Sequence, residues 1–167
     1  MSTTIVKENY PELTVDAGKS GKRIAAYLNY GASASYESPK WILFGGVTSS
    51  ALSVSVEVST TQTKDTGMWA EGAISAKSAE LSLEYLYKPG NVAQEALKSF
   101  VYDDEISNAK HALDVAVVDL DTKEYTRVWL IPNSLQSSAA AEDMVKDSMA
   151  ATVVGVPNRA SGFVEPE

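Results

Sequence analysis

The sequence predicts a single, mainly β domain that carries one α-helix in the middle of the chain. Apolar and polar residues alternate over 52–58 and again over 79–87, which is the period of a strand with one buried face. Helical spacing of apolar residues is clearest over 91–104. The length of 167 residues and the hydrophobic fraction of 44% suit one domain with a packed core.

Two short strands are expected before the first alternating segment. Residues 24–30 contain strand-forming Ile and Tyr, and residues 41–44 form an apolar run that ends at the glycine pair Gly45 and Gly46. The first twenty residues show little periodicity, so we interpret 1–20 as a flexible N-terminal arm. The folded domain is therefore expected to begin near residue 21.

The segment 52–58 is predicted to be a strand whose two faces differ. Its apolar members are expected in the core: Leu52, Val54, Val56 and Val58. Its polar members are expected on the opposite, solvated face: Ser53, Ser55 and Glu57. No apolar residue occurs from 59 to 67, which indicates a long exposed loop before the next strand.

The segment 91–104 has the features of a helix that packs on a sheet. Asn91 suits the N-cap, because its side chain can accept a hydrogen bond from a backbone N–H of the first turn. The apolar residues fall on one face, which is expected to pack against the sheet: Ala93, Ala96, Leu97, Phe100 and Val101.

Two β-rich segments follow the helix, 112–120 and 125–131, and the polar residues between them predict a hairpin. Residues 139–146 are ambiguous, because their alanines favour a helix. Residues 149–154 suit a strand that ends at Gly155. We therefore expect the folded domain to span 21–156 and a C-terminal tail to span 157–167.

Composition excludes several classes of protein. The chain contains no cysteine, which excludes disulfides and thiolate metal sites. A balance of 14 basic against 22 acidic residues gives a net charge of −8, whereas proteins that grip phosphates are usually basic. No apolar run is long enough to cross a bilayer, and the N-terminus lacks a secretory signal, so we expect synthesis in the cytoplasm and no membrane partner.

Candidate catalytic and ligand-binding residues are few and scattered. His111 is the only histidine, so a catalytic triad would rest on it alone, and the acidic run 103–105 lacks EF-hand spacing. A glycosidase carboxylate pair would come from Glu57, Glu71, Glu80 and Glu84. A sugar-stacking platform would come from Trp41, Trp69 and Trp129. We expect no enzymatic activity, no metal and no cofactor.

Several anchor residues resemble a known family. They are the run WILFGGVTSSALSVS at 41–55, the strand with Glu57, the Thr/Lys/Asp loop after it, and the segment GMWAEG at 67–72. With the later strand, helix and hairpin, this pattern resembles the major tail protein, or tail tube protein, of long-tailed bacteriophages over about residues 23–155. The resemblance implies a β-sandwich or barrel-like fold flanked by one helix. It also implies that 139–146 is a loop that leads into a strand.

The resemblance further implies a structural, non-enzymatic subunit. Its copies would form hexameric rings, stacked into a tube that encloses the channel for the genome. The loop would reach a neighbouring ring through these residues: Thr60, Thr61, Gln62, Thr63, Lys64 and Asp65. The channel would be lined by Ser53, Ser55 and Glu57, which have no positive charge with which to bind the DNA phosphates.

The implied partners are other copies of the chain, a tape measure protein, and tail terminator or distal tail proteins. DNA would pass through without specific binding. The implied location is the tail of the virion, after assembly in the host cytoplasm. The main alternative is a non-enzymatic β-sandwich binding module of the adhesin or carbohydrate-binding kind, and a third interpretation is an enzyme built around His111.

Overall fold

Seven strands form one antiparallel sheet in the described part of the chain, in the order β2-β1-β5-β6-β7-β4-β3. The computed structural model describes residues 21–65, 67–103 and 111–167, so the expected N-terminal arm, 1–20, lies outside the described residues. The bounds are β1 (Ile24–Asn29), β2 (Trp41–Leu43), β3 (Val47–Thr61), β4 (Glu71–Leu86), α1 (Val92–Tyr102), β5 (Leu113–Asp119), β6 (Glu124–Ser138) and β7 (Lys146–Ser161).

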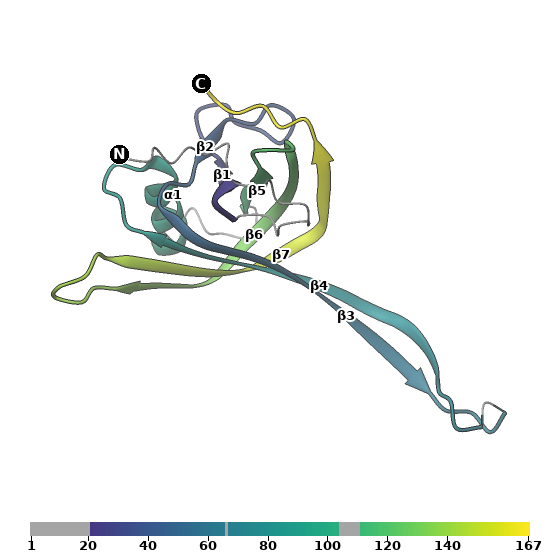
Figure 1. The fold of residues 1–167 in the computed structure, drawn as a ribbon. Helices are drawn as coiled ribbons and strands as arrows, with labels where there is room; N and C mark the ends of the chain where they lie inside the picture. The colour runs from purple at the N-terminus through teal and green to yellow at the C-terminus, as the bar shows by residue number, and fades with distance from the viewer. Residues whose placement is uncertain (1–20, 66, 104–110) are drawn as a thin grey trace, which may run out of the picture.

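The predicted mainly β fold with one helix is confirmed. The sheet curls round the core without closing into a barrel, because β2 and β3 remain its two edges. Figure 1 shows α1 beside the curled part and the β3–β4 hairpin extending far from it. Residues 139–145 form no helix, and β7 follows them directly, as the family resemblance implied.

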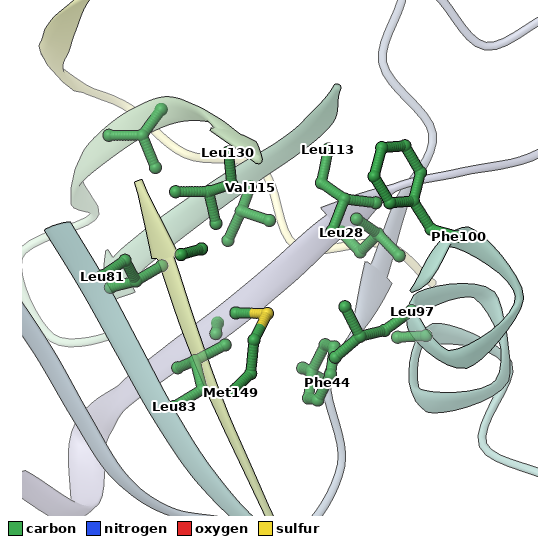
Figure 2. Close-up of a cluster of buried hydrophobic side chains, with 14 of the residues drawn as sticks. Leu28, Phe44, Leu81, Leu83, Leu97, Phe100, Leu113, Val115, Leu130 and Met149 are labelled. Carbon is green, nitrogen blue, oxygen red and sulfur yellow. The ribbon is translucent and has the colours of Figure 1, made fainter. Parts of the chain in front are cut away.

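The main core lies between α1 and the inner face of the sheet. Leu97 and Phe100 are buried and Val101 is half-buried. Figure 2 shows Leu97 and Phe100 pointing from α1 toward Phe44 and Leu28. The sheet supplies most of the other buried side chains: Ala26, Leu28, Ala79, Leu81, Leu83, Tyr85, Leu113, Val115, Val128, Leu130, Met149, Ala151 and Val153.

The start of α1 is held by side-chain amides. Asn91 is the N-cap, as predicted, and its Oδ1 accepts a hydrogen bond from the Gln94 backbone N–H at 3.1 Å. The side chain of Gln94 is fully buried, and its Nε2 donates to the carbonyl oxygens of Gly45 at 2.7 Å and Leu86 at 3.0 Å. Sequence reasoning did not single out Gln94, because periodicity gives no sign of a buried amide whose partners are distant backbone carbonyls.

A polar group is buried beneath α1. Asp147 is almost fully buried; it accepts a hydrogen bond from the Ser137 hydroxyl at 2.6 Å, and the Lys98 ammonium lies 3.8 Å from its Oδ2. Neither that Oδ2 nor the Tyr85 hydroxyl hydrogen-bonds to any described residue. Burial, reinforced by the negative charge of Asp147, raises the pKa of Tyr85 above its usual value.

The C-terminal segment belongs to the folded domain. We expected Gly155 to end the last strand, but β7 continues to Ser161. Gly155 has a φ of 78°, and pairing with β6 is interrupted there and resumes at Asn158, so the glycine makes an irregularity within the strand. The expected boundary at residue 156 thus falls inside β7. Beyond it, Phe163 is buried against Tyr27 and Tyr125, with ring centroids at 4.9 and 5.4 Å.

Truncation of the main helix anchor tests the docking of α1. Phe100→Ala is expected to lower the free energy of unfolding by about 3 to 5 kcal/mol, because it leaves a cavity between α1 and the sheet. Tyr102→Ala is the matched control on the same helix: its side chain is 77% exposed, so we expect a change within about 0.5 kcal/mol. Equal urea midpoints for Phe100→Ala and the wild type would contradict the docking.

The raised pKa of Tyr85 predicts a loss of stability at alkaline pH. Because the unfolded chain releases this proton near the ordinary value of 10.0 and the folded chain holds it longer, stability falls as pH rises above about 10. Tyr85→Phe removes the titrating group. Between pH 9 and about pH 11, the free energy of unfolding of this variant is expected to fall by up to roughly 1 kcal/mol less than that of the wild type. Urea unfolding at several pH values measures this, and parallel curves would contradict it.

Candidate functional site

The β3–β4 hairpin leaves the domain that anchors it. β4 pairs with β7 from Glu80 to Leu86, whereas residues 71–79 pair with β3 alone. Figure 1 shows the far half of the hairpin extending away from the curled sheet and from α1. Apart from the buried Ala79, both faces of that half therefore lie outside the subunit's own core.

The expected burial of the apolar residues of β3 is wrong for three of the four. Leu52 is half-buried opposite Leu81, but Val54, Val56 and Val58 are 58%, 49% and 58% exposed. The alternation correctly predicts a strand with two different faces. It fails on burial because the subunit's core ends at Leu52, and the strand continues beyond it.

Cross-strand pairing fixes which side chains share a face of the hairpin. On one face Val54, Val56 and Val58 stand opposite Ala79, Lys77 and Ile74. We call the exposed group on this side the hairpin apolar face: Val54, Val56, Val58 and Ile74. A register shift on β4, between Ala76 and Ile74, brings Ile74 opposite Val58 and so keeps the apolar side chains together.

The other face of the hairpin is polar and acidic. Ser53 stands opposite Glu80, Ser55 opposite Ser78, and Thr61 opposite Glu71. The face continues onto β7, where Glu80 pairs with Thr152 and Glu84 with Ser148. We call it the channel face and define it by its main polar members: Ser53, Ser55, Glu57, Glu71, Ser78, Glu80, Glu84, Ser148 and Thr152.

Sequence reasoning found only the β3 members of this face. Glu80 and Glu84 were visible as polar positions of an alternating strand, but strand pairing was needed to place them beside Ser53 and Ser49. Four carboxylates thus share one face. Lys77 lies on the opposite side of the hairpin, and Lys146, at the start of β7, is paired with Asp143 at 3.3 Å.

The tip of the hairpin lies three residues further along the chain than predicted, at 62–70 instead of 59–67, and therefore carries apolar side chains. Thr60 and Thr61 belong to β3, so of the expected loop contacts only Gln62, Thr63, Lys64 and Asp65 lie in the turn. The Gln62 side chain donates to the carbonyl oxygen of Gly67 at 2.8 Å. Met68 and Trp69, which follow the polar span, are 93% and 84% exposed.

The three candidate tryptophans do not form a common platform, because Trp69 lies at the hairpin tip, away from the other two. Trp41 and Trp129 lie near one another: the Arg127 guanidinium lies over the rings of Trp41 and Tyr36, and Tyr36 stacks on Trp129. In the described ranges, no group of three or more histidine, aspartate or glutamate residues could hold a metal ion. No helix of that part of the chain is long and apolar enough to cross a membrane.

Comparison with protein families decides between the readings that the sequence left open. The family model of phage tail tube proteins matches residues 19–159. The chain belongs to the phage tail tube protein family. It is therefore a structural component of a virion tail and not an enzyme. A search of curated proteins returns no match.

Solved structures show the same fold at low sequence identity. The tail of an empty gene transfer agent particle with C6 symmetry matches with a TM-score of 0.68 and 15% identity, over 86% of this chain and 100% of that chain. The SPP1 tail tube matches with a TM-score of 0.68 and 14% identity, over 87% and 80%. A chain of the sheath-tube complex of an extracellular contractile injection system matches with a TM-score of 0.62 and 12% identity, over 89% of this chain and 95% of that chain.

Replacement of the hairpin tip tests whether the tail tube subunit folds without it. We expect a variant in which an Asn-Gly turn replaces residues 62–70 to unfold within about 0.5 kcal/mol of the wild type, because the tip lies beyond the subunit's core. Thermal unfolding by circular dichroism measures this. A large fall in melting temperature would show that the tip supports the fold.

Proposed function

We propose that copies of this tail tube protein form stacked hexameric rings, and that the channel face lines the passage for DNA. The observation that carries the proposal is a polar, carboxylate-bearing face that spans β3, β4 and β7. Along β3 and β4 its polar side chains are exposed. The C6 symmetry of the matching gene transfer agent tail supports six copies per ring.

The edges of the sheet suit a wall that continues from copy to copy. β3 is one edge of the sheet. On the other side, β6 pairs with β5 only up to Leu130, so its residues 131–138 pair with β7 alone. The part of the sheet formed by β6, β7, β4 and β3 therefore has two open edges, one on β3 and one on residues 131–138 of β6. These edges can pair between neighbouring copies.

The charge of the face suits passage without binding. DNA adheres to proteins when lysine and arginine replace its condensed counterions. The channel face offers phosphates serine and threonine hydroxyls and four carboxylates, Glu57, Glu71, Glu80 and Glu84. A tube with six such faces per ring repels the DNA backbone weakly along its whole length, so no step of the passage requires release of a bound phosphate.

The hairpin tip is proposed to contact the neighbouring ring. Its turn carries polar side chains, including Lys64 and Asp65, and the exposed Trp69, which suits an anchor in a contact between proteins. A tape measure protein inside the tube, and tail terminator or distal tail proteins at its ends, are the further partners that we propose. The tube is assembled in the host cytoplasm in this proposal.

Imaging of the purified protein tests the ring. We expect negative-stain micrographs at high protein concentration to show rings or tubes, and rotational averaging of end views to give six-fold symmetry. A different rotational symmetry would contradict the hexamer. A chain that remains monomeric at every concentration, together with phage tails that lack it, would contradict the tube.

Positive charge on the channel face tests the passage. The double variant Ser55→Lys with Glu57→Lys is expected to fold and assemble, because both side chains are exposed, but to slow DNA ejection at low salt more than at high salt. A matched control, Ser38→Lys with Glu37→Lys, makes the same charge change on the exposed loop between β1 and β2. Wild-type ejection kinetics from both variants would place the channel on another face.

A further inference from the structure

The hairpin apolar face is an exposed surface without a cover in the subunit. Val54, Val58 and Ile74 are 58%, 58% and 61% exposed, on a two-stranded segment that neither α1 nor β7 overlies. Four neighbouring β-branched side chains on an edge hairpin favour association, because their burial removes apolar surface from water. A face of this kind in a tail tube protein needs a partner.

A second exposed apolar group lies on the middle of β6 and β7. Trp129 and Val154 stand directly opposite each other, and Ile131 follows on the same side of β6. Trp129 is 39% exposed, Val154 is 44% exposed and Ile131 is 47% exposed. We call these three residues the β6–β7 apolar patch. Tyr36 stacks on Trp129 with ring centroids 5.7 Å apart and extends the patch.

The two surfaces lie on opposite faces of one sheet. Val54 shares its face with Leu52 and with core residues such as Ala79 and Leu81. On β6 and β7 the core residues are Val128, Leu130 and Val153, so the alternate positions 129, 131 and 154 face away from the core. The hairpin apolar face is on the core side of the sheet and the β6–β7 apolar patch is on the channel side. The two surfaces therefore point in opposite directions, and a single partner surface cannot contact both.

The channel side itself changes character along β7. Near β4 it carries Ser148 and Thr152, which suit a solvated wall. Further along it carries Val154 opposite Trp129, an apolar pair that does not suit a solvated wall. Ile131 stands opposite Thr152, so the β6–β7 apolar patch borders the channel face directly. The apolar part of this face therefore has to be covered where the sheet curls away from the polar part.

We infer that the hairpin apolar face of one copy packs on the β6–β7 apolar patch of another copy. This inference rests on the proposed function and names the surfaces through which copies join. The contact is heterologous, since two different surfaces meet, and a repeated heterologous contact generates a closed ring or a helix. A second copy is the occupant because one chain offers both halves of the contact and belongs to a tube-forming family.

A charge pair tests the contact directly. Val56→Lys adds a second ammonium group opposite that of Lys77, and Val154→Glu adds a carboxylate to the patch, in a contact proposed to be mainly apolar. Each variant alone is expected to reduce the fraction of protein in tubes at least tenfold by sedimentation. The double variant is expected to recover most of the assembly, because the two charges meet across copies. Ser55→Lys is the matched control: it adds the same charge at the next residue, on the other face, and is expected to assemble normally.

The outcomes separate this inference from the proposed function. Failure of the wild type to form rings or tubes contradicts the proposed function itself. Normal tubes from Val56→Lys or Val154→Glu overturn the inference alone, and so does a double variant that stays unassembled while its melting temperature matches that of the wild type. In that last case each surface meets some other partner.

A cross-link gives a second measurement that does not depend on charge. The chain has no cysteine, so Val56→Cys with Val154→Cys introduces only the two thiols of interest. If the surfaces meet, mild oxidation of assembled tubes is expected to give a ladder of covalent oligomers on a non-reducing gel, because disulfides need Cα atoms within about 7 Å. The single-cysteine variants are the controls. A ladder no stronger than theirs overturns the pairing.

Discussion

The register of β3 on β4 is the constraint on which both functional surfaces depend. Successive side chains of a strand point to opposite faces, so a slip of one residue would exchange the valines with the serines and glutamate. Near the domain the register is fixed by the half-buried Leu52 opposite Leu81, which belongs to the main core. Further out, where no core remains, the pairing alone keeps Val58 with Ile74 and Thr61 with Glu71.

The two faces have opposite requirements, and the register separates them. A wall that faces DNA has to remain wet and free of cations, whereas a contact between copies has to be dry. β3 satisfies both requirements because its side chains alternate between the two faces, with Ser55 on the channel face and Val56 on the hairpin apolar face. The core of the subunit, with α1 docked through Leu97 and Phe100, holds the base from which the hairpin extends.

Much of the fold could be predicted from local pattern, but burial and partners could not. Alternation identified β3 and β4, and the Asn91 cap with apolar spacing identified α1, because these signals lie within a few residues of each other. The exposure of Val56 and the burial of Phe163 depend on where distant segments lie. The channel face required cross-strand pairing to join Glu80 to Ser53. The alternation of β3 predicts a strand whose apolar face is buried in the subunit's core. Only the fold shows that the valines of this face lie beyond that core and are exposed.

Thiol accessibility tests the central claim that the channel face lines the tube. Because the chain lacks cysteine, Ser55→Cys supplies a single reactive thiol on that face. In the free subunit this thiol is expected to react with a small maleimide and with one carried on a large polyethylene glycol chain. In assembled tubes it is expected to react with the small reagent and to be protected from the large one. Equal labelling of tubes and free subunits by the large reagent, or protection of tubes from both reagents, would contradict the account.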